Sequence, residues 1–182
     1  PGLGQAKDTQ NLVHQIIKFS KIPLVIDADG LNSLAGKAQI LSKARAPVIL
    51  TPHPGEMARL LGTGVDAVQQ DRIKCARNMA TGLNVQLILK GAGTVIAHPD
   101  GRVFINPSGN AGMASGGMGD VLTGIIAGLI VQGLSPENAC QAGVYLHGAA
   151  ADSLAETIGP YGYLAGDVMN AIPGEIKKIF QT

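Results

Sequence analysis

Aromatic side chains and charges of either sign are scarce in this sequence. Aromatic residues make up 3% of the 182 residues and tryptophan is absent, while charged residues make up 15% and leave a formal net charge of +1. Proteins that bind nucleic acid need basic surfaces for the phosphates, and many add aromatic rings on which bases stack. We therefore expect no nucleic-acid partner. The hydrophobic fraction of 46% also excludes a disordered tail.

Cysteines and long apolar runs are rare as well. Cys75 and Cys140 form no CxxC pattern and have no spacing typical of a disulfide framework, which favours free thiols in a reducing compartment. The most apolar run, residues 121–131, is about half as long as a membrane-spanning helix, and no signal peptide is recognisable. These absences predict a cytoplasmic protein that does not bind a membrane.

Glycine is the residue in excess, with 25 in the chain. Glycine adopts backbone conformations that are closed to other residues, so this number predicts tight turns and close backbone contacts. The chain has no repeat, linker or low-complexity tract, and its length suits one domain with a sizeable core. We expect a single domain over residues 1–182.

Short apolar runs alternate with helical patterns along the chain. Strands are expected at 23–27, 48–51 and 85–90, and a hairpin at 94–106 around Pro-Asp-Gly. Helices are expected at 9–20, 32–44 with a break at Gly36, 54–61, 66–81, 119–132, 135–158 and 163–180, the last kinked or split at Pro173. This alternation predicts an α/β fold with a mostly parallel sheet covered by helices on both faces. Small residues at 143–151 suggest close helix packing, which could lie between subunits.

A polar, glycine-containing segment follows each of the three expected strands. The segments are DADGLN at 27–32, TPHPGE at 51–56 and KGAGT at 90–94. Because parallel strands end at one edge of a sheet, we expect these segments to form one ligand cleft. Lys90 either meets a phosphate there or is an ordinary strand-ending lysine. Asp27 and Asp29 either belong to the cleft or cap the segment that follows.

His53 and Glu56 stand three residues apart across a Pro-Gly turn at the start of a helix. A zinc site is disfavoured because no third ligand has a familiar spacing. We favour a role in organising substrate or a metal-bound phosphate, and we predict no set of metal ligands supplied by the protein.

The stretch GGMGDVLTG, residues 116–124, places three glycines before one carboxylate at the start of an apolar helix. Gly116, Gly117 and Gly119 allow a turn with inward-pointing amides, and unpaired amides at a helix N-terminus bind anions. A carboxylate there repels a phosphate unless it acts, for example, as general base towards a substrate hydroxyl. Asp120 is therefore either that base or the N-cap of the helix. The stretch matches neither the Walker pattern nor a dinucleotide fingerprint.

The motifs resemble, in this order and spacing, those of the ADP/ATP-dependent NAD(P)H-hydrate dehydratases, metabolite-repair enzymes of the ribokinase-like superfamily. The matching segments are DADGLN, TPHPGEMARL, LKGAGTVIA and GNAGMASGGMGDVLTGIIAGLIVQGLSP, and PGLG at residues 1–4 is similar to the end of that family's GPGLG element. The resemblance implies a three-layer α/β/α fold with a mostly parallel central sheet. This chain would be the C-terminal two-thirds of that domain, without the first strands of the sheet.

The resemblance also implies a reaction and its residues. The S-epimer of hydrated NADH or NADPH would be dehydrated at the expense of ADP or ATP, with Mg²⁺ as counter-ion of the nucleotide. Asp120 corresponds to the catalytic acid of the family. The positions that correspond to nucleotide-binding residues are Lys90, Gly91, Ala92, Gly93, Thr94, Gly116, Gly117 and Gly119. Those that correspond to substrate-binding residues are Gly2, Gly4, His53 and Glu56, together with Asp120.

Two other functions stay open beside the dehydratase. The first is a small-molecule kinase of the same fold, which would release a phosphorylated vitamin precursor or sugar. The second is a non-catalytic nucleotide-binding module or an inactive fragment. The resemblance further implies a homo-oligomer, a tetramer in the family, and fusion to or partnership with an epimerase domain.

Overall fold

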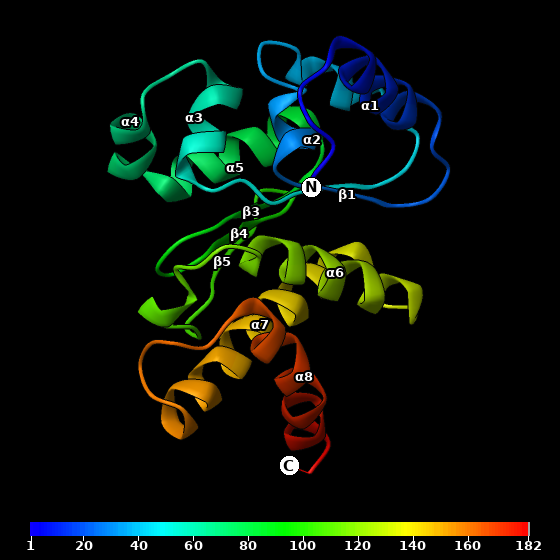
Figure 1. Cartoon of the computed structure of the whole chain (residues 1–182). Coiled ribbons are helices and arrows are strands. Elements are labelled where there is room, and N and C mark those ends of the chain that lie inside the picture. Colours follow the sequence, from blue (N-terminus) through cyan, green and yellow to red (C-terminus); the bar gives the residue numbers. More distant parts are fainter. Residues whose placement is uncertain (182) are drawn as a thin grey trace. The chain divides into compact units, whose positions relative to one another are not determined.

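Five strands form one sheet in the first of two units, Pro1–Ile105 and Asn106–Thr182, into which the chain divides. The structure is a computed structural model and describes residues 1–181. The strands follow one another across the sheet in the order β1-β2-β3-β4-β5 (Figure 1). Their bounds are β1 Leu24–Ile26, β2 Val48–Leu50, β3 Gln86–Leu89, β4 Val95–Ala97 and β5 Val103–Ile105.

The sheet is mixed, with a parallel part and an antiparallel part. β1, β2 and β3 pair in parallel, with Leu50 opposite Leu87. β4 and β5 are antiparallel to their neighbours, with Ile96 opposite Phe104. Short turns connect β3 to β4 and β4 to β5, and a short turn can join only antiparallel strands. The α/β class and the hairpin are confirmed.

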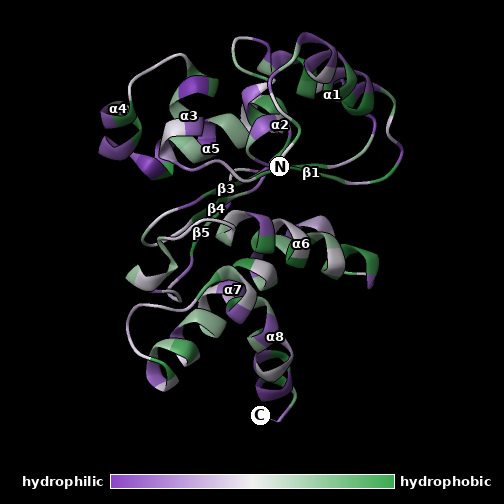
Figure 2. Cartoon of the chain, in the orientation of Figure 1, coloured by the Kyte–Doolittle hydropathy of each residue, from purple (hydrophilic) through white to green (hydrophobic). Residues whose placement is uncertain are grey.

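The helices of the first unit lie on the same side of its strands in Figure 1. They are α1 Lys7–Phe19, α2 Asp29–Asn32, α3 Pro54–Leu61, α4 Val65–Gln70 and α5 Arg72–Leu83, with a 3₁₀ segment η1 at Ala38–Lys43. One cluster of buried residues joins this layer to the sheet, including Ile17 of α1, Met57 of α3, Ala80 of α5 and Leu50 and Leu87 of the strands. Burying one large apolar side chain stabilises a fold by about 1.5–3 kcal/mol. Helix α1 carries both hydrophobic and hydrophilic residues (Figure 2), as a helix with one buried face requires.

Most expected elements appear, with three differences. The helix expected at 32–44 does not form: α2 ends at Asn32, Gly36 has φ of 69°, and residues 38–43 form the 3₁₀ segment η1. The helix expected at 66–81 is divided at Asp71, whose backbone leaves the helical region and whose carboxylate caps α5 by accepting a hydrogen bond from the amide of Lys74. Pro173 does not split the last helix, which runs without a break from Ala165 to Phe180.

Three helices make up most of the second unit. They are α6 Met118–Val131, α7 Pro136–Thr157 and α8 Ala165–Phe180, with a short 3₁₀ segment η2 at Ala111–Met113. α7 packs against both α6 and α8. It begins close to the expected residue 135, with Pro136 in the first turn and the Ser135 hydroxyl accepting a hydrogen bond from the amide of Asn138.

The small residues of α7 are used within the chain itself. A Cβ on Gly143 would lie 2.8 Å from Ile126 of α6, and a Cβ on Gly148 would lie 2.3 Å from the Ser108 hydroxyl. These contacts remove the packing argument for a subunit interface at 143–151, so the homo-oligomer rests on the resemblance alone. Over residues 1–181, no helix has the length and hydrophobicity needed to cross a bilayer.

Candidate active site

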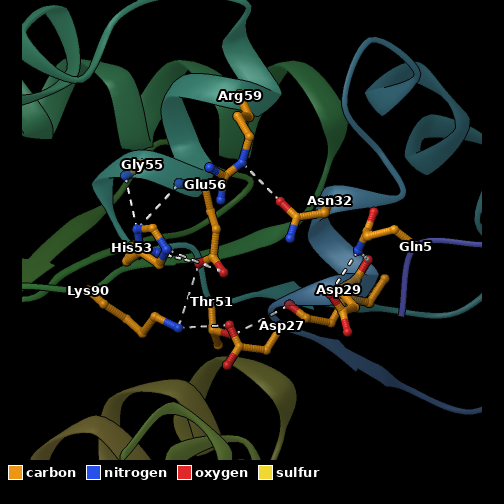
Figure 3. Close-up of polar contacts among 11 residues, drawn as sticks. Gln5, Asp27, Asp29, Asn32, Thr51, His53, Gly55, Glu56, Arg59 and Lys90 are labelled. Atoms are coloured by element: carbon orange, nitrogen blue, oxygen red, sulfur yellow. Dashed lines mark hydrogen bonds and ion pairs between the residues drawn. The ribbon is translucent and has the colours of Figure 1, made fainter. Parts of the chain in front are cut away.

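Three polar side chains meet where β1, β2 and β3 end. Lys90 follows β3, and its Nζ lies 2.7 Å from Oδ1 of Asp27, which follows β1. The same Nζ lies 3.8 Å from Oε2 of Glu56, in the helix that follows β2 (Figure 3). Asp27 and Glu56 are buried, while the side chain of Lys90 stays 22% exposed. The predicted gathering of the three strand ends is confirmed within this unit, and Lys90 is no ordinary surface lysine.

His53 and Glu56 form a reciprocal cap at the start of α3. Nδ1 of His53 accepts hydrogen bonds from the amides of Gly55 and Glu56, and Oε2 of Glu56 accepts one from the amide of His53. Because Nδ1 is an acceptor, the proton of a neutral ring sits on Nε2, 3.6 Å from Oε1 of Glu56. The side chain of His53 is half-exposed, so this cap presents an N–H donor to the surroundings of the strand ends.

The N-terminal segment is fastened to the first strand end through Asp29. Its carboxylate accepts a hydrogen bond from Nε2 of Gln5 at 2.7 Å (Figure 3). It also accepts one from the amide of Gly4 at 2.8 Å. The hydrogen bonds from Gly4 and then Gln5 lower the pKa of Asp29 below its ordinary value. Gly2 and Gly4 both adopt left-handed backbone conformations, with φ of 71° and 73°, which glycine adopts readily. The structure therefore brings the PGLG segment to the same edge as DADGLN.

The capping interpretation of Asp27 and Asp29 is wrong. Helix α2 has Ala28 at its N-cap and no capping side chain. Asp27 instead pairs with Lys90, and Asp29 binds the N-terminal segment. A cap depends on neighbouring residues, whereas both of these partners lie more than twenty positions away along the chain.

The KGAGT loop after β3 is supported by Arg72, which the sequence did not single out. Nη1 of Arg72 donates to the carbonyl of Ala92, and Nη2 donates to the carbonyls of Leu89 and Lys90. Gly91 and Gly93 have φ of 136° and 61°. No local pattern could have indicated this arginine, because the loop that it binds is 17 to 20 residues away.

In the second unit, Asp120 lies in the first turn of α6. The helix begins at Met118, one residue earlier than expected, and its N-cap is Gly117 with φ of 87°. No side chain caps this helix, so the interpretation of Asp120 as N-cap is wrong. Asp120 is exposed, and over residues 1–181 its carboxylate accepts no hydrogen bond. The amides of Met118, Gly119 and Asp120 likewise donate to no acceptor in the described chain, as at an open helix N-terminus.

A polar network supports the loop that precedes this helix. Asp152 of α7 accepts hydrogen bonds from the amide of Gly109 at 2.8 Å and from Nδ2 of Asn110 at 2.9 Å. Oδ1 of Asn110 accepts from the amide of Gly112 and from the hydroxyl of Tyr163. Asp152 near the end of α7 and Tyr163 in the loop before α8 therefore hold residues 109–112, and no motif in the sequence indicated either of them.

The chain matches known proteins over almost its whole length. The profile of the NAD(P)H-hydrate dehydratase family matches residues 1–174. The chain belongs to the NAD(P)H-hydrate dehydratase family. It is 49% identical over 179 residues to the bifunctional NAD(P)H-hydrate repair enzyme of Moorella thermoacetica, a match that covers 98% of this chain and 34% of that protein.

Two solved structures share the fold of this family member. The ADP/ATP-dependent NAD(P)H-hydrate dehydratase of Bacillus subtilis, co-crystallized with ATP/Mg²⁺, superposes with a TM-score of 0.89 at 38% identity, over 98% of this chain and 62% of that one. A ribokinase-like superfamily protein of Enterococcus faecalis gives a TM-score of 0.81 at 33% identity, over 98% and 61%. The predicted ribokinase-like α/β fold is confirmed. The chain spans about a third of the length of the Moorella relative and less than two-thirds of each of these two structures.

Proposed function

We propose that this chain carries the nucleotide-dependent dehydration of the S-epimer of hydrated NADH or NADPH, with ADP or ATP as co-substrate. Membership of the NAD(P)H-hydrate dehydratase family supports the reaction, and the ATP and Mg²⁺ of the Bacillus subtilis crystals support the nucleotide. The observation that carries the proposal is the exposed Asp120 carboxylate, which is committed to no hydrogen bond and stands beside unpaired amides.

In the proposed reaction, Asp120 takes the proton from the hydroxyl on the damaged nicotinamide ring. The hydroxyl oxygen attacks the terminal phosphoryl group of the nucleotide, and the shortened nucleotide leaves. Phosphate then leaves from the ring carbon while the adjacent ring carbon loses a proton, and the double bond formed between the two carbons restores NADH or NADPH. The amides around Gly116, Gly117 and Gly119 stabilise negative charge on the transferred phosphoryl group, which is the main protein contribution in phosphoryl transfer.

We also propose binding roles for the strand ends of the first unit. Lys90, Gly91, Ala92, Gly93 and Thr94 form the nucleotide segment, and Gly2, Gly4, His53 and Glu56 form the substrate segment. His53 suits this role because its exposed Nε2–H can donate to an oxygen of the dinucleotide. Glu56 acts more indirectly, since its carboxylate holds the backbone of His53.

Magnesium would bind together with the nucleotide, as the counter-ion of its phosphates. Within residues 1–181, no three or more His, Cys, Asp or Glu side chains cluster in a way that could hold a metal ion. Phosphate oxygens and water would supply the ligands of Mg²⁺, which is its usual coordination in nucleotide sites. The metal would neutralise the charge of the phosphates, while the protein groups named above place them.

The test is to incubate the full-length protein with hydrated NADH and either ADP or ATP. We expect the near-ultraviolet absorbance of NADH to recover only when nucleotide is present, with one inorganic phosphate released for each NADH formed. A stable phosphorylated product without recovery of NADH would identify a small-molecule kinase instead. Binding of nucleotide without either product would identify a non-catalytic module.

Three further parts of the proposal concern the surroundings of the enzyme. We propose that it works in the cytoplasm, because its free cysteines suit a reducing compartment. An epimerase, fused or separate, would supply the S-epimer, and the bifunctional Moorella relative supports this pairing. We also propose a homo-oligomer on the basis of the family resemblance. The mass of the protein in solution tests it.

A further inference from the structure

Arg72 makes a fork of hydrogen bonds to one loop. Its Nη1 donates to the carbonyl of Ala92, while its Nη2 lies 3.1 Å from the carbonyl oxygen of Leu89 and 3.3 Å from that of Lys90. The guanidinium is planar and carries its donors in a fixed arrangement, so three bonds to one backbone segment restrict the shape of that segment. Arg72 is the first residue of α5 and is itself fixed by the cap on that helix.

The carbonyls of this loop accept hydrogen bonds from the protein, whereas three of its amides have no acceptor in the described chain. The hydroxyl of Thr94 donates to the carbonyl of Gly91, so every carbonyl from residue 89 to residue 92 receives a protein donor. By contrast, the amides of Gly91, Ala92 and Gly93 donate to no acceptor among residues 1–181. Successive unpaired amides in a tight turn bind negatively charged or strongly accepting oxygens.

The contact between the arginine and the loop also explains the glycine at position 91. A Cβ on Gly91 would lie 3.0 Å from Nη2 of Arg72, and its φ of 136° disfavours any other residue. Glycine therefore allows the guanidinium to approach the backbone. The first glycine of the KGAGT motif is therefore needed for the contact with the distant Arg72.

Carboxylates balance the positive charge of Lys90, whereas Arg72 contacts neutral carbonyls. The ammonium of Lys90 lies between the carboxylates of Asp27 and Glu56. No carboxylate of the described chain lies within ion-pair distance of Arg72, whose bonds go to neutral carbonyls. Partial burial lowers the pKa of the guanidinium from its ordinary value, without removing its charge near neutral pH. The loop thus carries an uncompensated positive charge behind its open amides.

We propose that Arg72 is a positioning residue for nucleotide binding: it holds the carbonyls of residues 89–92 so that the amides of residues 91–93 stay open to acceptor oxygens of the nucleotide. This role rests on the proposed function, in which the same loop binds ADP or ATP. In this proposal Arg72, rather than Lys90, is the cation that holds the backbone conformation of the loop.

The test compares Arg72→Gln, Arg72→Lys and Gly91→Ala in the full-length protein. Arg77→Gln is the matched control, because Arg77 lies on the same helix and its Nε also donates to a backbone carbonyl, that of Gly101 in the β4–β5 turn. Each variant is measured by amide hydrogen exchange of Lys90, the loop residue whose amide donates to the carbonyl of Pro52, without ligand. Calorimetric titrations with ADP and with adenosine follow, and thermal unfolding shows whether the variant is folded.

We expect Arg72→Gln to speed exchange in the loop and to weaken ADP binding by about tenfold or more, since bonds from a charged donor are lost. Arg72→Lys should fall in between, because lysine keeps the charge without the planar fork. Gly91→Ala should give the same two effects with Arg72 intact, which keeps the test valid if the glutamine variant fails to fold. Weaker binding of ADP alone assigns the amides to phosphate oxygens, and equal weakening for adenosine assigns them to the nucleoside.

Loop exchange and ADP affinity within twofold of wild type in folded Arg72→Gln would overturn the proposal, as would an equal change in Arg77→Gln. A wild-type protein that binds no nucleotide would overturn the proposed function as well. That failure is distinguishable, because the exchange data on the loop would still show whether Arg72 holds it.

Discussion

Nζ of Lys90 and Oδ1 of Asp27 lie 2.7 Å apart, although the two residues are 63 positions apart in the sequence. The contact joins the ends of β1 and β3 across the strand between them, and Asp27 is 2% exposed. A buried carboxylate is tolerated when it is paired and hydrogen-bonded. The ion pair is therefore part of what holds the strand ends in register around the candidate site.

Replacing Lys90 with methionine should destabilise the protein. Asp27 and Glu56 would then be buried without their cation, and removal of one partner of a buried ion pair costs about 3–5 kcal/mol. Lys90 is partly exposed, so we expect a loss at the lower end of that range. Denaturant unfolding measures the change, with the exposed Lys74→Met of α5 as control. Equal stability of the two variants would show that Lys90 does not compensate these carboxylates.

The hold of Asp29 on the N-terminal segment should depend on pH in a defined direction. Its pKa is lowered in the folded protein from an ordinary value of 3.8, chiefly by the hydrogen bond from Gly4. The contribution to stability is therefore fully present above pH 3.8 and is lost as the pH falls through the lower, folded value. The amide resonance of Gly4 should follow this titration in NMR spectra, and Asp29→Asn should abolish it. A Gly4 resonance that moves only at a higher pH would contradict the assignment.

His53 combines a structural and a proposed substrate role, which two substitutions separate. His53→Ala removes the N-cap and should cost about 1 kcal/mol of stability, whereas His53→Asn keeps a good N-cap. If Nε2–H also contacts the dinucleotide, the asparagine variant should keep its stability and show a raised KM for hydrated NADH. An unchanged KM in His53→Asn would leave His53 with the capping role alone.

Gly148 should tolerate no side chain, in contrast to a glycine of the neighbouring helix. A Cβ at Gly148 would lie 2.6 Å from backbone atoms of Ser108, so Gly148→Ala should destabilise the fold by about 1–3 kcal/mol. Gly174 of α8 has open space around it, and Gly174→Ala should be neutral or stabilise by up to about 1 kcal/mol. Chemical unfolding of both variants checks the contrast, and similar values would show that α7 does not pack closely on the 106–109 segment.

The sequence predicted the elements well because their signals are local. In α3, Pro54 stands at the first position and Gly62 directly after the last, and the apolar runs marked the strands. The hairpin of β4 and β5 was expected, whereas its antiparallel pairing with β3 was not, because an apolar run does not record which strand becomes its neighbour.

Within the site, the motif residues were found and their supports were not. Lys90 and His53 stand in readable motifs, whereas Arg72 and Asp152 act on segments far away in the chain and have no signature of their own. The pairing of Asp27 with Lys90 was missed for the same reason, since the sequence shows both residues and no distance between them. Asp120 differs, because its local pattern left two roles open and only the observed N-cap at Gly117 removed one of them.

The central claim is that Asp120 is the general base, and the most direct measurement is turnover of hydrated NADH by Asp120→Asn in the presence of ATP. The substitution keeps the size of the side chain and removes its basicity, so we predict that nucleotide binding persists while kcat falls by about a hundredfold or more. Asp66→Asn, which changes another exposed first-turn aspartate, is the control and should turn over at the wild-type rate. Turnover by Asp120→Asn within a few-fold of wild type would contradict the claim.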